Sequence, residues 1–189
     1  MTNFESGVAS DSTNDRAPHV ATEPDRTRFE LESTVPGLVL RTLTAADQAA
    51  YAVIADRMVQ QEIARGDERA YGEIWAGWGH DFAGSTDAHH RFGIWLDEKI
   101  IGRVDLLAVD PPSYGLSYWL DPDFMGRGHA MACVRRVMAF AAELGADALY
   151  AGVKPDNVRS IALLKRLEFE LIADLGTHQR FRFAFPRHV

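Results

Sequence analysis

The chain has 189 residues, one cysteine and a formal net charge of -7 at pH 7. Its length fits one domain with a full hydrophobic core, and one cysteine excludes an intrachain disulfide and a cysteine-based zinc site. The acidic balance argues against nucleic-acid binding, which needs a basic face. We expect no metal, and the single cysteine favours a cytoplasmic location. We also expect no membrane contact, because no apolar run approaches the roughly 20 residues that span a bilayer.

The N-terminal third changes character near residue 37. The first 30 or so residues are rich in Ser, Thr, Asp, Asn and Pro, which predicts a disordered tail over residues 1–30. A single folded domain is expected over residues 37–187, beginning with a short strand at 38–43 and a helix that Thr44 caps. Between Met58 and His90 five glycines interrupt the apolar residues, which predicts one or two short helices and a mobile loop.

The remaining elements alternate between strands and helices. Apolar runs separated by short polar turns predict an antiparallel meander, with strands at 91–96, 100–109 and 114–120. Apolar residues at helical spacing predict a helix over about 127–144. A buried strand at 148–153, a helix at 157–167 and strands around 169–172 and 180–185 follow. The strand after the long helix should lie parallel to the strand before it. The expected fold class is therefore α/β (α+β) with a mixed, mostly antiparallel sheet.

A glycine-bearing turn marks the candidate functional site. Residues 125–130, Met-Gly-Arg-Gly-His-Ala, stand between the apolar Tyr118-Trp119-Leu120 and the predicted long helix. The first N–H groups of a helix have no partner within it, so they offer a site for an anion. A side chain at Gly126 or Gly128 would hold a phosphate away from these N–H groups. The turn predicts binding of a phosphate-bearing cofactor.

Two longer runs carry a family resemblance. YWLDPDFMGRGHA and VRRVMAFAAELGADALYAGVKPDNVRSIALLKRLEF resemble the GNAT superfamily of N-acetyltransferases, most closely its ribosomal-protein-alanine N-acetyltransferase-like (RimJ/RimL-type) branch. The family pattern Gln/Arg-x-x-Gly-x-Gly/Ala falls on residues 125–130, where Met125 replaces the usual Gln or Arg. A later Asn-x-x-Ser/Ala pattern falls on Asn157 and Ser160, and Glu168 stands where the family has glycine.

This resemblance implies a GNAT-like acyl-CoA N-acyltransferase fold, whose central sheet opens into a V and carries helices on both faces. It implies acetyl-CoA as co-substrate, with the pantetheine along residues 118–120 and the pyrophosphate on the turn. The implied cofactor-binding residues are Tyr118, Trp119, Leu120, Met125, Gly126, Arg127, Gly128, His129, Ala130 and Asn157. The implied reaction is direct transfer, in a ternary complex, to a primary amine of a protein N-terminus or a small molecule, by a monomer or homodimer.

The residues that move protons are a separate question. Many relatives have a tyrosine and a glutamate where this chain has Leu164 and Gly115. Asp105 is the first candidate for a base, with a solvated strand carboxylate as the alternative. Ser160 is a candidate acid or proton relay, with a serine that only caps its helix as the alternative. The missing groups keep open a second hypothesis, an acyl-CoA-binding sensor or interaction domain without efficient catalysis.

Three aromatic residues are candidates for acceptor binding. The resemblance places the acceptor beside the helical region before the meander, which contains Trp75 and Trp78, and Tyr114 is close enough in sequence to reach the same cleft. Packing in the core is the alternative for each of them. A doubly wound nucleotide-binding enzyme is disfavoured, because the meander precedes the glycine turn and no Walker or dinucleotide fingerprint is present.

Overall fold

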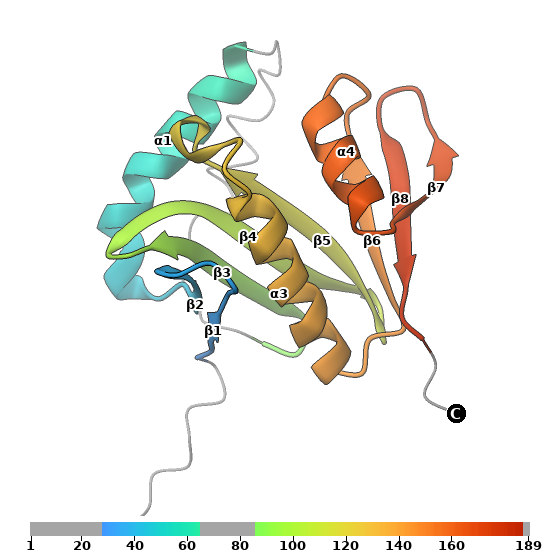
Figure 1. The fold of residues 1–189 in the computed structure, drawn as a ribbon, viewed down its shortest axis with the longest axis horizontal. Helices are drawn as coiled ribbons and strands as arrows, with labels where there is room; N and C mark the ends of the chain where they lie inside the picture. The colour runs from blue at the N-terminus through green and yellow to red at the C-terminus, as the bar shows by residue number, and fades with distance from the viewer. Residues whose placement is uncertain (1–27, 65–85, 187–189) are drawn as a thin grey trace, which may run out of the picture.

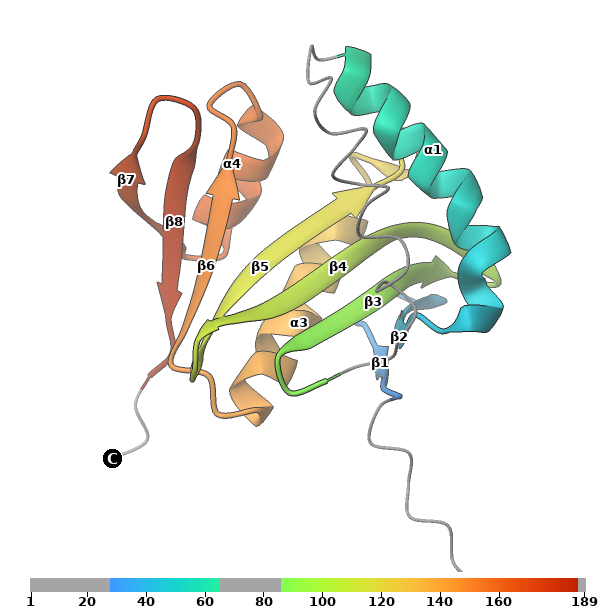
Figure 2. The ribbon, with the colours of Figure 1, turned by 180° about the vertical axis from the view of Figure 1, so that it is seen from behind.

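The strands of the protein form one mixed eight-stranded sheet in the computed structural model, which describes residues 28–64 and 86–186 (Figures 1 and 2). No helix within these two ranges is long and apolar enough to cross a bilayer. The elements in chain order are β1 (Glu30–Glu32), β2 (Leu38–Thr42), η1 (Ala45–Asp47), α1 (Gln48–Ala64), β3 (His89–Leu96), β4 (Lys99–Asp110), β5 (Ser113–Leu120), η3 (Pro122–Phe124), α3 (His129–Glu143), β6 (Ala148–Val153), α4 (Val158–Arg166), β7 (Glu170–Asp174) and β8 (Gln179–Ala184).

The strand order is β1-β2-β3-β4-β5-β6-β8-β7. Every neighbouring pair is antiparallel except β5 and β6, which are parallel. The predicted meander of β3, β4 and β5 is confirmed, as is the parallel crossover through α3. The mixed, mostly antiparallel sheet with helices matches the fold class that the sequence predicts.

The central pair of strands separates after a short contact. Residues 113–115 of β5 pair with residues 148–150 of β6, and the register ends at the partners Gly115 and Tyr150. Beyond that point β5 continues to Leu120, and among the described strands it pairs there only with β4. Figure 2 shows β5 and β6 diverging from their shared lower ends. The sheet therefore opens into the V that the family resemblance implies.

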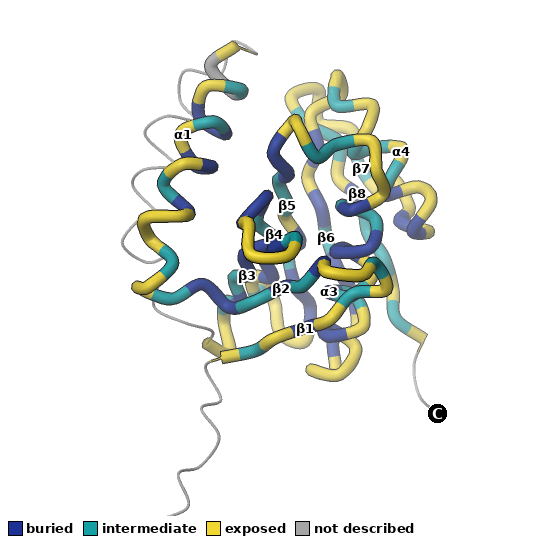
Figure 3. The backbone as a smooth tube through the Cα atoms, turned by 60° about the vertical axis from the view of Figure 1, so that its left-hand side comes forward, coloured by how far each residue is buried: buried dark blue, intermediate teal, exposed yellow. Residues whose placement is uncertain are grey.

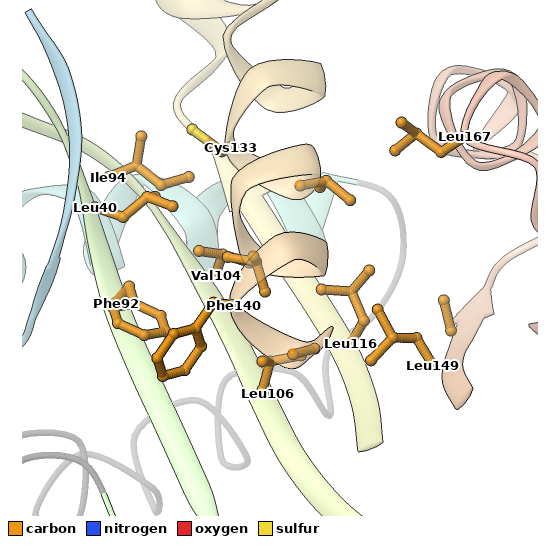
Figure 4. Close-up of a cluster of buried hydrophobic side chains, with 14 of the residues drawn as sticks. Leu40, Phe92, Ile94, Val104, Leu106, Leu116, Cys133, Phe140, Leu149 and Leu167 are labelled. Atoms are coloured by element: carbon orange, nitrogen blue, oxygen red, sulfur yellow. The ribbon is translucent and has the colours of Figure 1, made fainter. Parts of the chain in front are cut away.

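Helices cover both faces of the sheet because the strands alternate their side chains between two apolar clusters. On one face, Phe140 of α3 packs edge-on against Phe92 of β3, with ring centroids 5.5 Å apart (Figure 4). On the other face, Tyr51 of α1 belongs to a second cluster with Trp95 and Ile100. Figure 3 shows the buried backbone concentrated in the strands between these helices. The two clusters fix the sheet between α1 and α3.

The sheet begins earlier than the sequence predicts. β1 precedes the expected domain start at residue 37 and pairs with β2, partnering Leu31 with Leu40. The strand has three residues and one apolar side chain, that of the buried Leu31. A strand of this length is too short to show an alternation of apolar and polar residues. The remaining boundaries differ by a few residues at most where they are described, and β6 has the predicted bounds. Most of the predicted disordered tail lies outside the described residues.

Candidate functional site

A groove follows the opening between β5 and β6. It consists of two adjoining pockets of about 370 and 400 Å³, which share Tyr118, Asn157, Arg159 and Ser160 as lining residues. The first pocket lies between residues 116–118 of β5 and residues 151–153 of β6, with Lys154 just beyond that strand. The second extends along residues 118–120 to the N-terminus of α3 and one face of α4. The groove thus runs from the opening between the two strands to a helix N-terminus.

The turn at that end is open toward the groove. Gly126 and Gly128 have φ angles of +77° and +85°, which glycine adopts without strain. An added Cβ at either position would meet no atom within 4 Å, so packing does not require glycine there. Gly128 caps α3 without a side chain, and the first backbone bond of the helix runs from the Ala132 N–H to the Gly128 carbonyl. The preceding N–H groups of the turn suit the phosphates of a cofactor.

An ion pair holds the segment that leads into this turn. Arg57 of α1 donates to Asp121 Oδ2 at 2.6 Å and to Asp123 Oδ2 at 2.8 Å. The side chain of Asp121 is buried, and its Oδ1 accepts the Asp123 N–H at 3.0 Å. The hydrogen bond from Arg57 lowers the pKa of the Asp123 carboxyl. No local pattern in the sequence pointed to Arg57, which lies 64 residues before Asp121.

Asn157 caps helix α4 and also lines the groove. It is the N-cap of α4, where its Oδ1 accepts the Ser160 N–H at 3.2 Å. Its amide NH₂ has no hydrogen-bond partner among residues 28–64 and 86–186, and Asn157 lines both pockets. The capping bond fixes the side-chain orientation, so the NH₂ group is held ready to donate to a ligand.

The structure brings most of the predicted cofactor-binding residues together. Arg127 is the exception, since its guanidinium lies over the Phe124 ring, 5.9 Å from the centroid, and the residue lines neither pocket. The predicted residues that line the second pocket are Tyr118, Trp119, Leu120, Met125, Gly126, Gly128, His129, Ala130 and Asn157. One surface thus gathers residues from β5, the turn and the start of α4.

Two hydroxyl groups lie where the pockets meet. The Tyr118 hydroxyl is buried, and burial raises the pKa of Tyr118, an effect that the nearby Ser160 hydroxyl only partly opposes. The two groups do not reach standard hydrogen-bond geometry. Ser160 itself is partly exposed to the groove, whereas Leu164 is fully buried in the core. Tyr118 and Ser160 are therefore the hydroxyl side chains at the junction of the pockets.

Asp105 is a buried partner of two arginines. Arg91 Nε lies 2.5 Å from Oδ1 and Arg103 Nε 2.9 Å from Oδ2, and the Ser117 hydroxyl donates to Oδ2 at 3.1 Å. Burial raises the pKa of Asp105, yet Arg103, a hydrogen bond from His89 and Arg91 together hold that pKa well below its ordinary value. Such a carboxylate is a weak base, which argues against the predicted catalytic role. The alternative of a solvated carboxylate is also wrong, because the residue is 5% exposed.

Of the three residues predicted to bind the acceptor, the structure describes only Tyr114. Tyr114 is buried among the residues that face α3 and lines neither pocket, so it packs in the core instead of reaching the groove. Trp75 and Trp78 lie outside the described residues. Trp119 points to the α1 face, where its Nε1 donates to Gln61 Oε1 at 2.9 Å. In the described part of the chain no group of three or more His, Cys, Asp and Glu is placed to hold a metal ion.

Comparison with known proteins identifies the kind of domain. A family model described as an acetyltransferase (GNAT) domain matches residues 37–170 of the chain. That range begins at the glycine before β2 and ends at the first residue of β7, so it contains the whole groove.

Solved structures with a similar fold include three acetyltransferases. The ribosomal L7/L12 alpha-N-protein acetyltransferase RimL, without ligand, is 17% identical with a TM-score of 0.63, covering 84% of this chain and 95% of its own. RimJ of Mycobacterium smegmatis, in complex with CoA-disulfide, is 19% identical with a TM-score of 0.60, covering 83% and 86%. The microcin C7 self-immunity acetyltransferase MccE, in complex with acetyl-CoA and AMP, is 13% identical with a TM-score of 0.59, covering 80% and 94%.

Proposed function

Because the chain belongs to the GNAT acetyltransferase family, whose enzymes use acetyl-CoA as co-substrate, we propose that it transfers the acetyl group directly to a primary amine while both molecules occupy the groove. The observation that carries the proposal is the open turn at Gly126 and Gly128, which meets the groove at a helix N-terminus. The positive φ angles of both residues favour glycine, and the open space beside them leaves the approach of a ligand to the backbone N–H groups unobstructed.

Each part of the groove has a matching role in binding. The N–H groups from Gly126 to Ala130 receive the pyrophosphate. Within the described residues, the β6-facing edge of β5 has no strand partner beyond Gly115, so its backbone groups pair with the pantetheine amides like a neighbouring strand. The Asn157 NH₂ donates to the same arm. A backbone N–H of β5 at the thioester carbonyl stabilises the negative charge that develops there.

Proton transfer falls to the hydroxyl groups and water. The amine must lose a proton as the C–N bond forms, and the sulfur must gain one as the C–S bond breaks. Ser160 lies at the junction of the pockets and relays a proton to the leaving sulfur, with the Tyr118 hydroxyl behind it. The proton of the amine leaves through water, because Asp105 is committed to its arginines.

The acceptor is a primary amine of a protein N-terminus or of a small molecule. The net charge of -7 favours a cationic acceptor modestly. One of the similar structures is named as an alpha-N-protein acetyltransferase, which supports including N-terminal peptides among the acceptors tested. A monomer or homodimer is expected, and sedimentation velocity distinguishes the two.

A thiol-release assay with acetyl-CoA and a panel of N-terminal peptides, polyamines and aminoglycosides tests the proposal. Turnover with at least one class identifies the acceptor. A second function, binding of acyl-CoA without catalysis, is favoured by the burial of Leu164 and by the ion pairs of Asp105. Tight binding of CoA without thiol release across the panel would establish that alternative, and absence of CoA binding would exclude both.

A further inference from the structure

One face of α4 turns toward the second pocket. Residues on this face recur every three or four positions, as neighbours on a helix surface do. They are Arg159, Ala162, Leu163 and Arg166. Across the pocket lies the turn at Gly126 and Gly128, and Figure 1 shows α3 and α4 on the two sides of the opening between β5 and β6. Ala162 and Leu163 separate the two arginines along this face.

Both arginines lack a carboxylate partner. Arg159 and Arg166 form no ion pair with any residue of 28–64 or 86–186, whereas Arg57 and Arg136 each pair with a carboxylate. Arg159 Nη1 contacts the sulfur of Met125 at 3.5 Å, which places its guanidinium beside the glycine turn. Arg159 is also the second residue of α4, where a positive charge opposes the helix dipole. A bound anion in the groove would offset this unfavourable charge.

The ligand chemistry follows from the two kinds of donor. The turn of α3 offers neutral N–H groups, which suit the pyrophosphate. Coenzyme A carries a third phosphate, a monoester on the ribose, which bears up to two negative charges at neutral pH. A guanidinium binds such a group with two parallel hydrogen bonds. In a protein with a net charge of -7, unpaired arginines at the groove supply the local attraction that this phosphate needs.

We propose that Arg159 and Arg166 bind the ribose 3′-phosphate of coenzyme A while the α3 turn binds the pyrophosphate. The groove then distinguishes coenzyme A from 3′-dephospho-coenzyme A. This inference rests on the proposed function, because it takes an acyl-CoA as the ligand of the groove. The two arginines would then add a site on α4 that selects the ligand, beside the cofactor-binding residues of β5, the turn and Asn157.

Isothermal titration calorimetry with the two ligands tests the site without turnover. The proteins are the wild type, Arg159→Gln, Arg166→Gln and the control Arg135→Gln, which removes an exposed arginine of α3 that lines neither pocket. Wild type and control should bind coenzyme A at least about tenfold more tightly than dephospho-coenzyme A, as expected for a charge-assisted hydrogen bond. Each α4 variant should lose about tenfold for coenzyme A and little for dephospho-coenzyme A.

The outcomes separate cleanly. A preference for coenzyme A that disappears in the α4 variants supports the site. An equal loss for both ligands, or no loss for either, overturns it, because the arginines would then act on another group or on none. Thermal unfolding without ligand checks that the variants fold, since both side chains are exposed. If the wild type binds neither ligand, the proposed function fails as well. If the wild type and the α4 variants bind coenzyme A with the same affinity, only the role of the two arginines is contradicted.

Discussion

Arg57 Nη1 lies 2.6 Å from Asp121 Oδ2, so helix α1 is tied directly to the segment that carries the glycine turn. Asp121 is a buried carboxylate and its other oxygen holds the Asp123 N–H. The pair therefore orients the turn from a helix on the opposite face of the sheet.

Removing this pair should weaken cofactor binding at a distance. In Arg57→Gln the buried Asp121 carboxylate loses its counter-ion, so the unfolding midpoint falls and the Kd for coenzyme A rises several-fold because the turn is no longer held. Denaturant unfolding and calorimetry measure the two effects. Asp56→Asn, an exposed change on the same helix, is the control and should alter neither. Unchanged affinity in a folded Arg57→Gln protein would show that the turn holds its geometry without the pair.

Gly128→Glu should abolish coenzyme A binding. The change places a carboxylate where the pyrophosphate meets the α3 N-terminus, and the positive φ adds roughly 1 kcal/mol of strain. Gly145→Glu is the matched control, because Gly145 has a φ of +79° and equally open surroundings at the other end of α3. Both variants carry the strain of a positive φ, Gly145→Glu also opposes the helix dipole, and only Gly128→Glu should lose the ligand in a thermal-shift assay. Retained binding would remove the turn from the site.

Asn157 allows its two tasks to be separated. Asn157→Asp keeps an oxygen that caps α4 but replaces the NH₂ donor with a negative charge. Asn157→Ala removes both and should cost about 1 kcal/mol of unfolding free energy. We expect weakened coenzyme A binding in both variants and lower stability in Asn157→Ala alone. Normal affinity in Asn157→Asp would mean that Asn157 acts only as a cap.

Asp105→Asn should act through stability. The folded-state pKa of Asp105 is depressed, so its contribution is complete above the ordinary pKa of about 3.9 and is lost as the pH falls below that value. Loss of this buried ion-pair partner should cost about 3 kcal/mol in urea unfolding at pH 7. Asp110→Asn, at the exposed end of the same strand, should cost little. A stable Asp105→Asn protein that binds coenzyme A yet fails in turnover would restore Asp105 as the base.

His90→Phe should stabilise the protein, most strongly in acid. Burial lowers the pKa of His90, an effect that Asp87 opposes and His89 reinforces, so the folded state resists protonation. Below pH of about 6.5 the unfolded chain takes up this proton, and stability falls as the pH decreases. Phenylalanine suits the ring cluster with Phe29 and Phe140 and removes two unpaired ring nitrogens. Unfolding free energies from pH 5 to 8 should show a gain of about 1–3 kcal/mol that grows toward acid. Parallel curves would contradict this.

Much of the fold and the cofactor side of the groove follows from local patterns. The strand β6 has its predicted bounds, and the turn at Gly126 and Gly128 begins a helix as its glycines indicate. These features depend on neighbouring residues, which the sequence displays directly. The parallel pairing of β5 with β6 follows from the right-handed crossover connection that α3 makes between them.

Contacts between residues that are far apart in the sequence could not be predicted from such local patterns. Arg57 meets Asp121 across 64 positions of sequence, and no local signal links them. The carboxylate of Asp105 lies among residues of β3, β4 and β5, so its partners depended on a register that the sequence alone does not set. The side chain of Tyr114 points into the core, because side chains alternate between the two faces of a strand and the register of β5 sets which face Tyr114 occupies.

The early end of the β5 and β6 pairing also bears on aggregation. A free strand edge usually invites another polypeptide to add to the sheet, and proteins commonly defend it with charges or proline. Here the free edge of β5 lies inside the molecule, with β6 facing it and α3 and α4 flanking the opening. Between α3 and α4 there is less room for a polypeptide strand, which carries side chains on both faces, than for the thinner pantetheine arm. The same geometry that admits a small ligand therefore protects the sheet from other proteins.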